Sequence, residues 1–283
     1  MKKIRIGGVP EHFNLPWYQA IEDGDFQSVG IDVHWTDYPD GTGAMTKALE
    51  EDKIDIAIVL TEGIIKAIHA ENPARIVQTY VESPLKWGIH VAASSEFHSI
   101  EDLQGKRIAI SRPGSGSHLM SYLHAESMGW PVDQLRFVEI GTLPGAIKAL
   151  QQREADYFMW EHYTTKPIVD SGIFRRLGDY PTPWPCFVIA VSQHYLQTSP
   201  DVIRQLLDSI NQRTLIFKNI PNIEKQIAER FGQQETDVRQ WLKQTNWSQH
   251  LLSNNTLDFI QQKLTSLGII ERPTAVANLL HSL

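Results

Sequence analysis

The chain has 283 residues, which is enough for one large domain or for two domains of ordinary size, each with its own core. Hydrophobic residues make up 42% and charged residues 21%, as in folded globular proteins. The formal net charge of -7, without a basic stripe, argues against nucleic acid or a phospholipid surface as a partner. The single cysteine, Cys186, excludes an internal disulfide and a cysteine-based metal site.

The start of the chain bears on its location. The sequence MKKIRIGGV leads directly into a predicted strand, without the apolar segment of a secretion signal behind its two lysines. No window is long and apolar enough for a transmembrane helix, so we expect no direct insertion into a membrane. These features favour a cytoplasmic protein. The alternative is a periplasmic or exported protein whose signal has been removed.

The first part of the chain alternates predicted strands and helices. The strand of KIRIGGV ends at two glycines, and the loop PEHFNLPW leads into the next helix, which places Glu11 at the end of that strand. Glu62 follows the apolar strand of DIAIVL in the same way. We predict strands over residues 3–9, 31–38, 55–60, 74–81 and 87–93. We predict one helix over residues 16–23, a second that begins near residue 42 or 43, and a third that begins after residue 63.

The stretch KRIAISRPGSGSHLM repeats this pattern from a new starting point. A buried strand over residues 108–110 breaks into a glycine-rich turn, and a helix capped by Ser115 or Ser117 runs on to Gly129. The unpaired N–H groups of such a helix start can bind an anionic or polar ligand group. The segments LRFVEI and GTLPGAIKALQQREADYFMWEHY then predict a strand, a glycine loop, a helix and a strand, and CFVIAVSQHYL beyond Pro185 predicts an apolar strand.

The last third of the chain is predicted to be helical. Five segments place apolar residues at helical spacing behind a capping residue, the last of them being TAVANLLHS. The aromatic residues of these helices are predicted to be core residues rather than ligand contacts: Phe217, Phe231, Trp241 and Phe259.

These elements predict an α/β protein of two lobes with a helical C-terminal tail. The spacing of about 30 residues per strand and helix is what right-handed crossovers need. We predict that the chain crosses between the lobes near 88–93 and near 186–190. Lobe 1 then comprises 1–90 and 190–283, lobe 2 comprises 91–189, and the crossings form a hinge beside a ligand-binding cleft.

The candidate cleft residues have a mixed chemistry. Two helix starts, together with Arg112 and His118, favour an anionic group. Three carboxylates could accept a hydrogen bond from an amine or a ring N–H: Glu11, Glu62 and Glu161. Four indoles could stack on a planar ring or cover a cation: Trp17, Trp87, Trp160 and Trp184. Because a bare sulfonate or nitrate would leave the carboxylates without partners, we expect a small zwitterionic or heteroaromatic ligand.

Each of these residues also has a structural interpretation. His12 could make only a structural hydrogen bond, and Glu62 could only cap the following helix. Trp17 could be a core residue of lobe 1, and Trp184, between two prolines, could stiffen the hinge. Arg112 could pair with a surface carboxylate.

Five segments resemble the type II periplasmic-binding-protein fold, and within it the nitrate, sulfonate and taurine binding group with its relatives that bind thiamine-pyrimidine precursors. They are KIRIGGVPEHFNLPW, ALEEDKIDIAIVLTEG, SIEDLQGKRIAISRPGSGSHL, GAIKALQQREADYFMWEHY and TLDFIQQKLTSLGII, and they span nearly the whole chain. The resemblance implies closure of two lobes on a small molecule, an ABC-transporter membrane component as a possible partner, and no cofactor or metal. It implies ligand contacts at Pro10, Glu11, His12, Gly43, Ala44, Thr61, Glu62, Ser115, Gly116, Ser117, His118, Trp160 and Glu161.

An enzyme is the alternative. Lyases or dehydratases of menaquinone biosynthesis use a similar fold in the cytoplasm, and His12 or His118 could act as a base beside a glutamate or a serine. No GxSxG, HExxH or Walker pattern supports this, so no residue is predicted to be catalytic. The single cysteine argues against the pyrimidine-synthesising enzymes of this fold, which have a cysteine-rich motif. A ligand-sensing partner of another protein is a third possibility.

Overall fold

A computed structural model describes residues 1–283 and divides into two compact units. Unit 1 comprises Met1–Ser83 and Trp184–Leu283, and unit 2 comprises Pro84–Pro183. The predicted α/β class is confirmed, because each unit is a mixed five-stranded sheet with helices. The predicted lobe boundaries, 90/91 and 189/190, fall inside strands β5 and β10, because the apolar runs WGIHVAA and CFVIAV lie within the sheets rather than between them.

The sheet of unit 1 has the strand order β2-β1-β3-β10-β4. β1 is parallel to β2 and β3, whereas β10 is antiparallel to β3 and β4. The fully buried β10 therefore lies inside the sheet although it comes last in the sequence. The bounds are β1 Lys2–Gly8, β2 Ile31–Asp37, β3 Ile56–Leu60, β4 Ala74–Val81 and β10 Phe187–Ser192.

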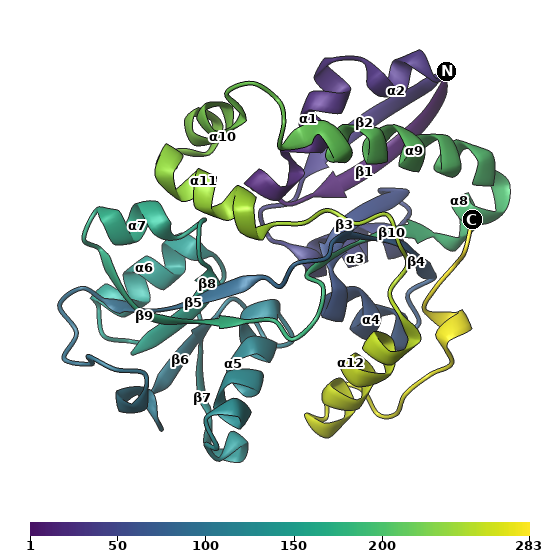
Figure 1. Ribbon diagram of the computed structural model, residues 1–283. Helices are drawn as coiled ribbons and strands as arrows, with labels where there is room; N and C mark the ends of the chain where they lie inside the picture. The colour runs from purple at the N-terminus through teal and green to yellow at the C-terminus, as the bar shows by residue number, and fades with distance from the viewer. The chain divides into compact units, whose positions relative to one another are not determined.

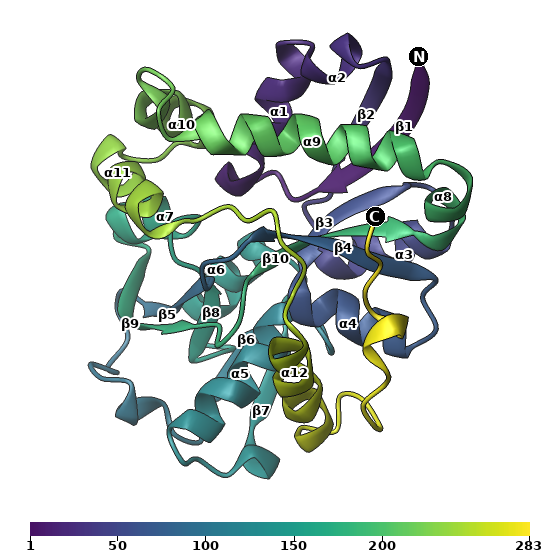
Figure 2. The same ribbon diagram turned by 45° about the vertical axis from the view of Figure 1, so that its right-hand side comes forward.

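Helices cover both faces of this sheet. The chain moves from β1 outward to β2 and then back across to β3, so right-handed crossovers place the connecting helices α1 and α3 on opposite faces. Figures 1 and 2 show α9 beside α1 and α2, and α12 beside α4. The bounds are α1 Leu15–Glu22, α2 Asp25–Ser28, α3 Thr42–Glu50, α4 Thr61–His69, α8 Gln193–Thr198, α9 Pro200–Phe217, α10 Ile223–Phe231, α11 Glu235–Gln244 and α12 Asn254–Ser266. No helix is both long and apolar enough to cross a membrane.

Two glycines let aromatic rings close over the end of β1. A Cβ at Gly8 would lie 2.4 Å from the ring of Trp35, and a Cβ at Gly7 would lie 2.8 Å from the ring of Tyr38. Trp35 also packs against Trp17, with ring centroids 5.9 Å apart. The glycine pair therefore reflects close packing at this end of the strand.

The sheet of unit 2 has the same strand arrangement as that of unit 1, with the order β7-β6-β8-β5-β9, but its inner antiparallel strand, β5, comes first in the unit rather than last. β6 is parallel to β7 and β8, and β5 is antiparallel to β8 and β9. The bounds are β5 Lys86–Ala92, β6 Arg107–Ile110, β7 Arg136–Glu139, β8 Tyr157–Glu161, β9 Phe174–Pro181, α5 Gly116–Ser127, α6 Leu143–Gln151 and α7 Lys166–Asp170.

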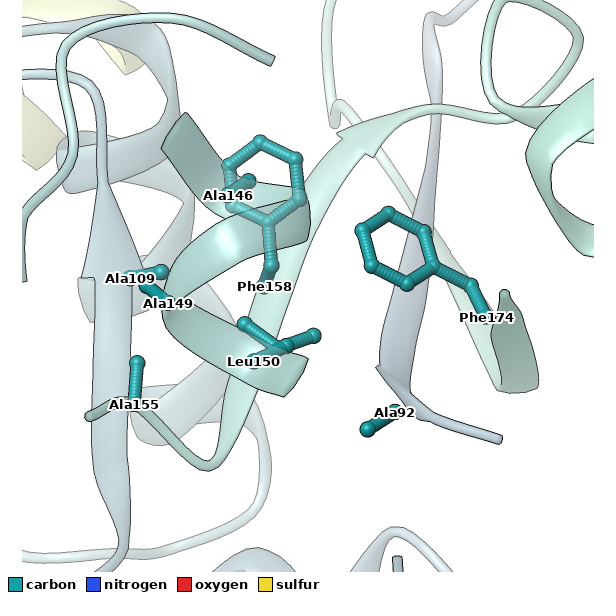
Figure 3. Packing of buried hydrophobic residues seen from close by; sticks show 8 residues of the cluster. All are labelled: Ala92, Ala109, Ala146, Ala149, Leu150, Ala155, Phe158 and Phe174. Carbon is teal, nitrogen blue, oxygen red and sulfur yellow. The ribbon is translucent and has the colours of Figure 1, made fainter. Parts of the chain in front are cut away.

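The core of unit 2 combines two aromatic rings with small side chains. Figure 3 shows Phe158 of β8 and Phe174 of β9 with alanines of neighbouring elements and Leu150 of α6. The alanines Ala146 and Ala149 let α6 pack closely on the sheet. Trp160 packs against this cluster while staying partly exposed.

One strand was missed, and two local predictions were wrong. β9 was not predicted, because its charged and half-exposed residues follow no alternating pattern. The segment TAVANLLHS forms only a short 3-10 turn, Val276–Asn278, because main-chain hydrogen bonds draw the chain end alongside Ile76 of β4. Phe259 is 39% exposed rather than in the core.

Candidate functional site

The parallel strands of unit 1 end at one edge of their sheet and bring several predicted ligand contacts together there. Pro10 and Glu11 follow β1, and Thr61 and Glu62 follow β3 as the first turn of α4. The start of α3, with Gly43 and Ala44, joins this edge because the Thr42 hydroxyl accepts a hydrogen bond from the Leu60 N–H at 3.1 Å. Pro10 and Gly43 are exposed, and Glu11 and Ala44 are half-buried.

Glu62 is the most unusual group at this edge. Its side chain is 2% exposed, and its Oε2 accepts a hydrogen bond from the indole Nε1 of Trp184 at 2.8 Å. Its Oε1 is buried and has no hydrogen-bond partner. Burial raises the pKa of Glu62 to about 7, against the lowering effect of its own N–H and of Trp184. Carboxyls with such a pKa cluster at functional sites.

The chain returning from unit 2 is bonded directly to this edge. The Thr61 hydroxyl donates to the Pro185 carbonyl at 2.6 Å, and the Thr61 N–H donates to the Cys186 carbonyl at 3.1 Å. Trp184 itself is 2% exposed and bonds to Glu62. The position of Trp184 between Pro183 and Pro185 suggested a stiffening role, but no sequence pattern indicated a bond to Glu62.

Two predicted contacts of unit 1 lie in its interior. His12 is 1% exposed, its ring centroid lies 4.5 Å from that of Trp241 and 4.6 Å from that of Phe13, and burial lowers its pKa to about 3. Trp17 is fully buried and stacks on Phe26 at 5.7 Å. Both placements match the structural interpretation of these residues.

In unit 2 the start of α5 carries three linked hydroxyls. Ser115 is the N-cap, and its hydroxyl accepts from the His118 N–H at 3.3 Å. The Ser117 hydroxyl lies 3.1 Å from both the Ser115 and the Ser111 hydroxyls and accepts from the Ser111 N–H at 3.0 Å. The predicted cap at Ser115 is thus confirmed, and hydroxyls and helix N–H groups meet at the end of β6.

The imidazole ring of His118 contacts other groups than these serine hydroxyls. Its Nδ1 accepts from the Gly114 N–H at 2.9 Å, and its ring lies edge-on to Phe137 at 4.5 Å and to Tyr122 at 5.0 Å. Nδ1 is therefore not placed to take a proton from Ser115 or Ser117. Gly116, the first residue of α5, is half-buried.

Glu161 ends β8, next to β6 in the sheet, and resembles Glu62 in its surroundings. It is 4% exposed, and one oxygen accepts from the Thr164 N–H at 2.6 Å. Burial raises its pKa to about 7, opposed by the main-chain N–H groups of Thr164 and Tyr163 and by the positive charge of Arg176. Trp160 precedes it, stacked on Phe158 at 5.2 Å.

A polar network beside Glu161 had no counterpart in the sequence interpretation. On β9, Arg176 donates to His90 Nε2 at 3.2 Å and to the His162 carbonyl at 2.6 Å, while His162 Nδ1 lies 2.7 Å from Asp179. Burial and the charge of Arg176 lower the pKa of His90 to about 3. The charged residues of β9 are typical of an exposed segment, so the sequence offered no signal of a buried network.

The two units show no group of three histidine, cysteine, aspartate or glutamate side chains placed to hold a metal ion. The arrangement offers hydroxyls, helix N–H groups, buried carboxyls and an indole, which are groups that bind ligands.

A family model described as Ca3427-like PBP matches residues 87–180. Over 100% of this chain, the structure also matches the product of the CA3427 gene of Candida albicans, with 25% identity, a TM-score of 0.91 and 97% of that chain covered. That protein is described as defining a new family with the generic periplasmic-binding-protein fold. This chain has the predicted periplasmic-binding-protein fold.

Other structures of the same fold include two SsuA proteins. The alkanesulfonate-binding protein SsuA of Xanthomonas axonopodis pv. citri, bound to MOPS, is 17% identical over 100% of this chain and 99% of that chain, with a TM-score of 0.85. The periplasmic aliphatic sulphonate-binding protein SsuA of Escherichia coli is 16% identical over 100% of this chain and 94% of that chain, with a TM-score of 0.74.

No curated protein matches the sequence. The SsuA protein of Escherichia coli is described as periplasmic. This relative gives the predicted cytoplasmic location no support and allows the periplasmic alternative.

Proposed function

We propose that this chain is a solute-binding protein whose two units close on a small zwitterionic or heteroaromatic ligand. The ligand carries an anionic group together with an amine, amidine or ring N–H. Its predicted contacts are those named above at the strand ends of both units. Such a protein would deliver its ligand to an ABC-transporter membrane component, in the periplasm.

One observation carries the choice of ligand: each unit holds a buried carboxyl beside the end of a central strand. Glu62 and Glu161 are 2% and 4% exposed, and burial raises the pKa of each to about 7. A buried carboxylate oxygen without a partner is unfavourable, and Oε1 of Glu62 is such an atom, so a ligand N–H or ammonium group would supply the missing partner there. A ligand with only a sulfonate would instead bring a second negative charge close to these groups.

The remaining groups suit the other parts of the ligand. The hydroxyl cluster at the start of α5 offers O–H and N–H donors to an anionic group. The partly exposed Trp160, stacked on Phe158, offers a flat surface to a planar ring. SsuA of Xanthomonas is bound to MOPS, which has both a sulfonate and a tertiary amine, so a ligand of mixed charge is compatible with this fold.

Calorimetry with matched pairs of compounds tests the proposal. Taurine is compared with ethanesulfonate, and 4-aminopyrimidine with pyrimidine, with β-alanine as a further zwitterion. We expect an amine-bearing compound to bind better than its partner, and Glu62→Gln and Trp160→Ala to weaken that binding while the far-ultraviolet dichroism stays unchanged. Equal binding of both partners of each pair, or unchanged affinity in both variants, would contradict the proposed ligand class.

Incubation with futalosine-type and chorismate-type compounds tests the enzyme alternative. We expect no turnover, because His118 is not oriented toward a serine hydroxyl through Nδ1. Turnover by the purified protein that Glu62→Gln abolishes would overturn the solute-binding proposal.

A further inference from the structure

The carboxyl of Glu62 lies in uncharged surroundings within unit 1. Its Oε2 has the Trp184 indole as a donor, and its buried Oε1 has no hydrogen-bond partner. An indole N–H is neutral, so it stabilises a carboxylate less than a lysine or an arginine would. A fully buried carboxylate without a cation is strongly disfavoured relative to the neutral acid.

No charged group of unit 1 compensates for this burial. α4 packs mainly against α3, α12, β3, β4 and β10. The titratable side chains of these elements, of α4 and of the segment beside Trp184 are Lys47, Glu50, Lys66, His69, Arg75, Tyr80, Cys186, Asp258 and Lys263. None of them contributes to the pKa of Glu62, which burial raises to about 7 and which only the Glu62 N–H and Trp184 lower.

We propose that at mildly acidic pH Glu62 is a neutral acid in the ligand-free protein and exchanges its proton for a basic group of the ligand, with Trp184 as the positioning residue for this exchange. This inference rests on the proposed function. When an ammonium or amidinium group bonds to Oε1, the O–H bond of Glu62 breaks, the proton passes to solvent, and the resulting carboxylate pairs with the ligand cation. No other bond changes.

Trp184 is well placed for this role because it is the first residue of unit 1 after unit 2. The two residues that follow it, Pro185 and Cys186, accept both hydrogen bonds of Thr61. The chain that returns from unit 2 therefore holds both the N–H and hydroxyl of Thr61, through Cys186 and Pro185, and the carboxyl of Glu62, through Trp184.

The exchange makes affinity depend on pH in one direction. Below the pKa of Glu62 the ligand must displace a proton, so binding weakens as the pH falls; above it, binding levels off. With one proton and a pKa of about 7, affinity is about tenfold lower at pH 6 than at pH 8.

NMR titration of the ligand-free protein, labelled with ¹³C at glutamate carboxyls, tests the protonation of Glu62. The Glu62→Gln and Glu161→Gln variants assign the two resonances. We expect a Glu62 midpoint near 7, which Trp184→Phe raises by about 1 pH unit through loss of the N–H donor. Trp247→Phe, a replacement elsewhere in unit 1, should leave it unchanged. A Glu62 midpoint near 4.5, or the same midpoint in Trp184→Phe as in the parent, would overturn the inference without touching the proposed function.

Of taurine, β-alanine and 4-aminopyrimidine, the first two are ammonium ions at pH 6.5. Calorimetry at that pH, in phosphate and in Bis-Tris, then counts the protons released by whichever of these two binds more tightly. We expect a release of about three quarters of a proton, which is the protonated fraction of Glu62 at pH 6.5 for a pKa of about 7. Glu62→Gln should abolish this release. If the compound binds but no proton release depends on Glu62, the proton exchange is overturned and the solute-binding proposal stands. Failure of all three compounds to bind, with ethanesulfonate bound, overturns both proposals even if Glu62 titrates near 7.

Discussion

Arg107 forms a bidentate ion pair with Asp156: its Nε donates to Oδ2 at 3.0 Å and its Nη2 donates to Oδ1 at 2.8 Å. The Arg107 N–H donates to Oδ2 as well, and the Asp156 N–H donates to the Arg107 carbonyl. Arg5 and Asp55 make the same set of bonds in unit 1. Each of these ion-pair clasps joins the first parallel strand of its unit, β1 or β6, to the residue before β3 or β8. The two units therefore share this local ion pair as well as the arrangement of their strands.

Breaking the clasp of unit 2 should destabilise the protein. Partial burial alone would raise the pKa of Asp156, but the hydrogen bonds and charge of Arg107 outweigh it and hold that pKa below its usual value. We expect Asp156→Asn to lower the free energy of unfolding by about 1–2 kcal/mol at pH 7. Urea unfolding measures this loss. The control is Asp170→Asn, which removes a more exposed carboxylate paired with Lys166.

The pH dependence provides a second check of the clasp. Because the folded pKa of Asp156 is depressed, its stabilisation is present above the unfolded pKa of about 4 and is lost as the pH falls through the folded pKa. The difference between Asp156→Asn and the parent should therefore shrink below about pH 4. A loss of the same size at pH 3 and at pH 7 would show that the ion pair is not its origin.

Glu62→Gln should stabilise the ligand-free protein at alkaline pH. The folded pKa of Glu62, about 7, lies above the usual value of 4.5, so its contribution is fully present below pH 4.5 and is lost as the pH rises toward 7. The uncharged amide of the variant would mimic the neutral acid at every pH. We expect a gain of up to about 3 kcal/mol at pH 8 and little change at pH 4.5, measured by urea unfolding. A variant less stable than the parent at pH 8 would argue against a buried neutral acid.

Most of the fold could be predicted from the sequence where local signals are strong. The apolar runs of β3, β6 and β10, and the cap at Ser115, have simple causes in burial and in helix-end hydrogen bonding, and the structure contains each of them. The pairing of strands that are distant in the sequence could not be predicted, because no local sequence pattern indicates which strands lie side by side. The placement of β10 between β3 and β4, the half-exposed β9 and the extended end of the chain all depend on partners distant in sequence.

The candidate site also has a part that could be predicted from the sequence and a part that could not. Strand ends correctly located Thr61, Glu62 and Glu161 beside parallel strands, because the position of a residue after a strand is a local property. The partners that give these residues their chemistry were not predictable. Trp184 lies 122 positions from Glu62 in the sequence, and the network of Arg176 depends on a strand that was not predicted.

His124 should make the protein sensitive to acid. It is 2% exposed, its ring lies 5.3 Å from that of Trp130 and 5.5 Å from that of Tyr180, and its Nδ1 has no hydrogen-bond partner. Burial lowers its pKa to about 4, so the unfolded chain binds this proton at a higher pH than the folded chain. Stability attributable to His124 is thus lost as the pH falls from about 6.5 to 4.

A His124→Phe variant isolates this effect. We expect the fall in unfolding free energy between pH 7 and pH 4.5 to be smaller in the variant by up to about 2.5 kcal/mol, since phenylalanine cannot be protonated. Part of the fall should remain, because burial also lowers the pKa of His12 and His90 to about 3. An unchanged fall would exclude His124 as a source of acid sensitivity.

Gly145→Ala should destabilise unit 2 although it lies in a helix, where alanine is normally favoured over glycine by about 1 kcal/mol. A Cβ at this position would lie 1.9 Å from the carbonyl oxygen of Ile140, which is main chain and cannot rotate away. We expect a loss of about 2 kcal/mol or more in thermal or urea unfolding. Lys148→Ala, at an exposed position of the same helix, should cost almost nothing. Stabilisation by Gly145→Ala would mean that the start of α6 can shift.

The insertion of β10 between β3 and β4 sets an order of events during synthesis on the ribosome. β4 has its main sheet partner only after residue 187 has been made, about a hundred residues later. The whole of unit 2 emerges in that interval, and its own sheet needs nothing that follows Pro183. Unit 2 can thus complete its sheet before the sheet of unit 1 receives its last strand.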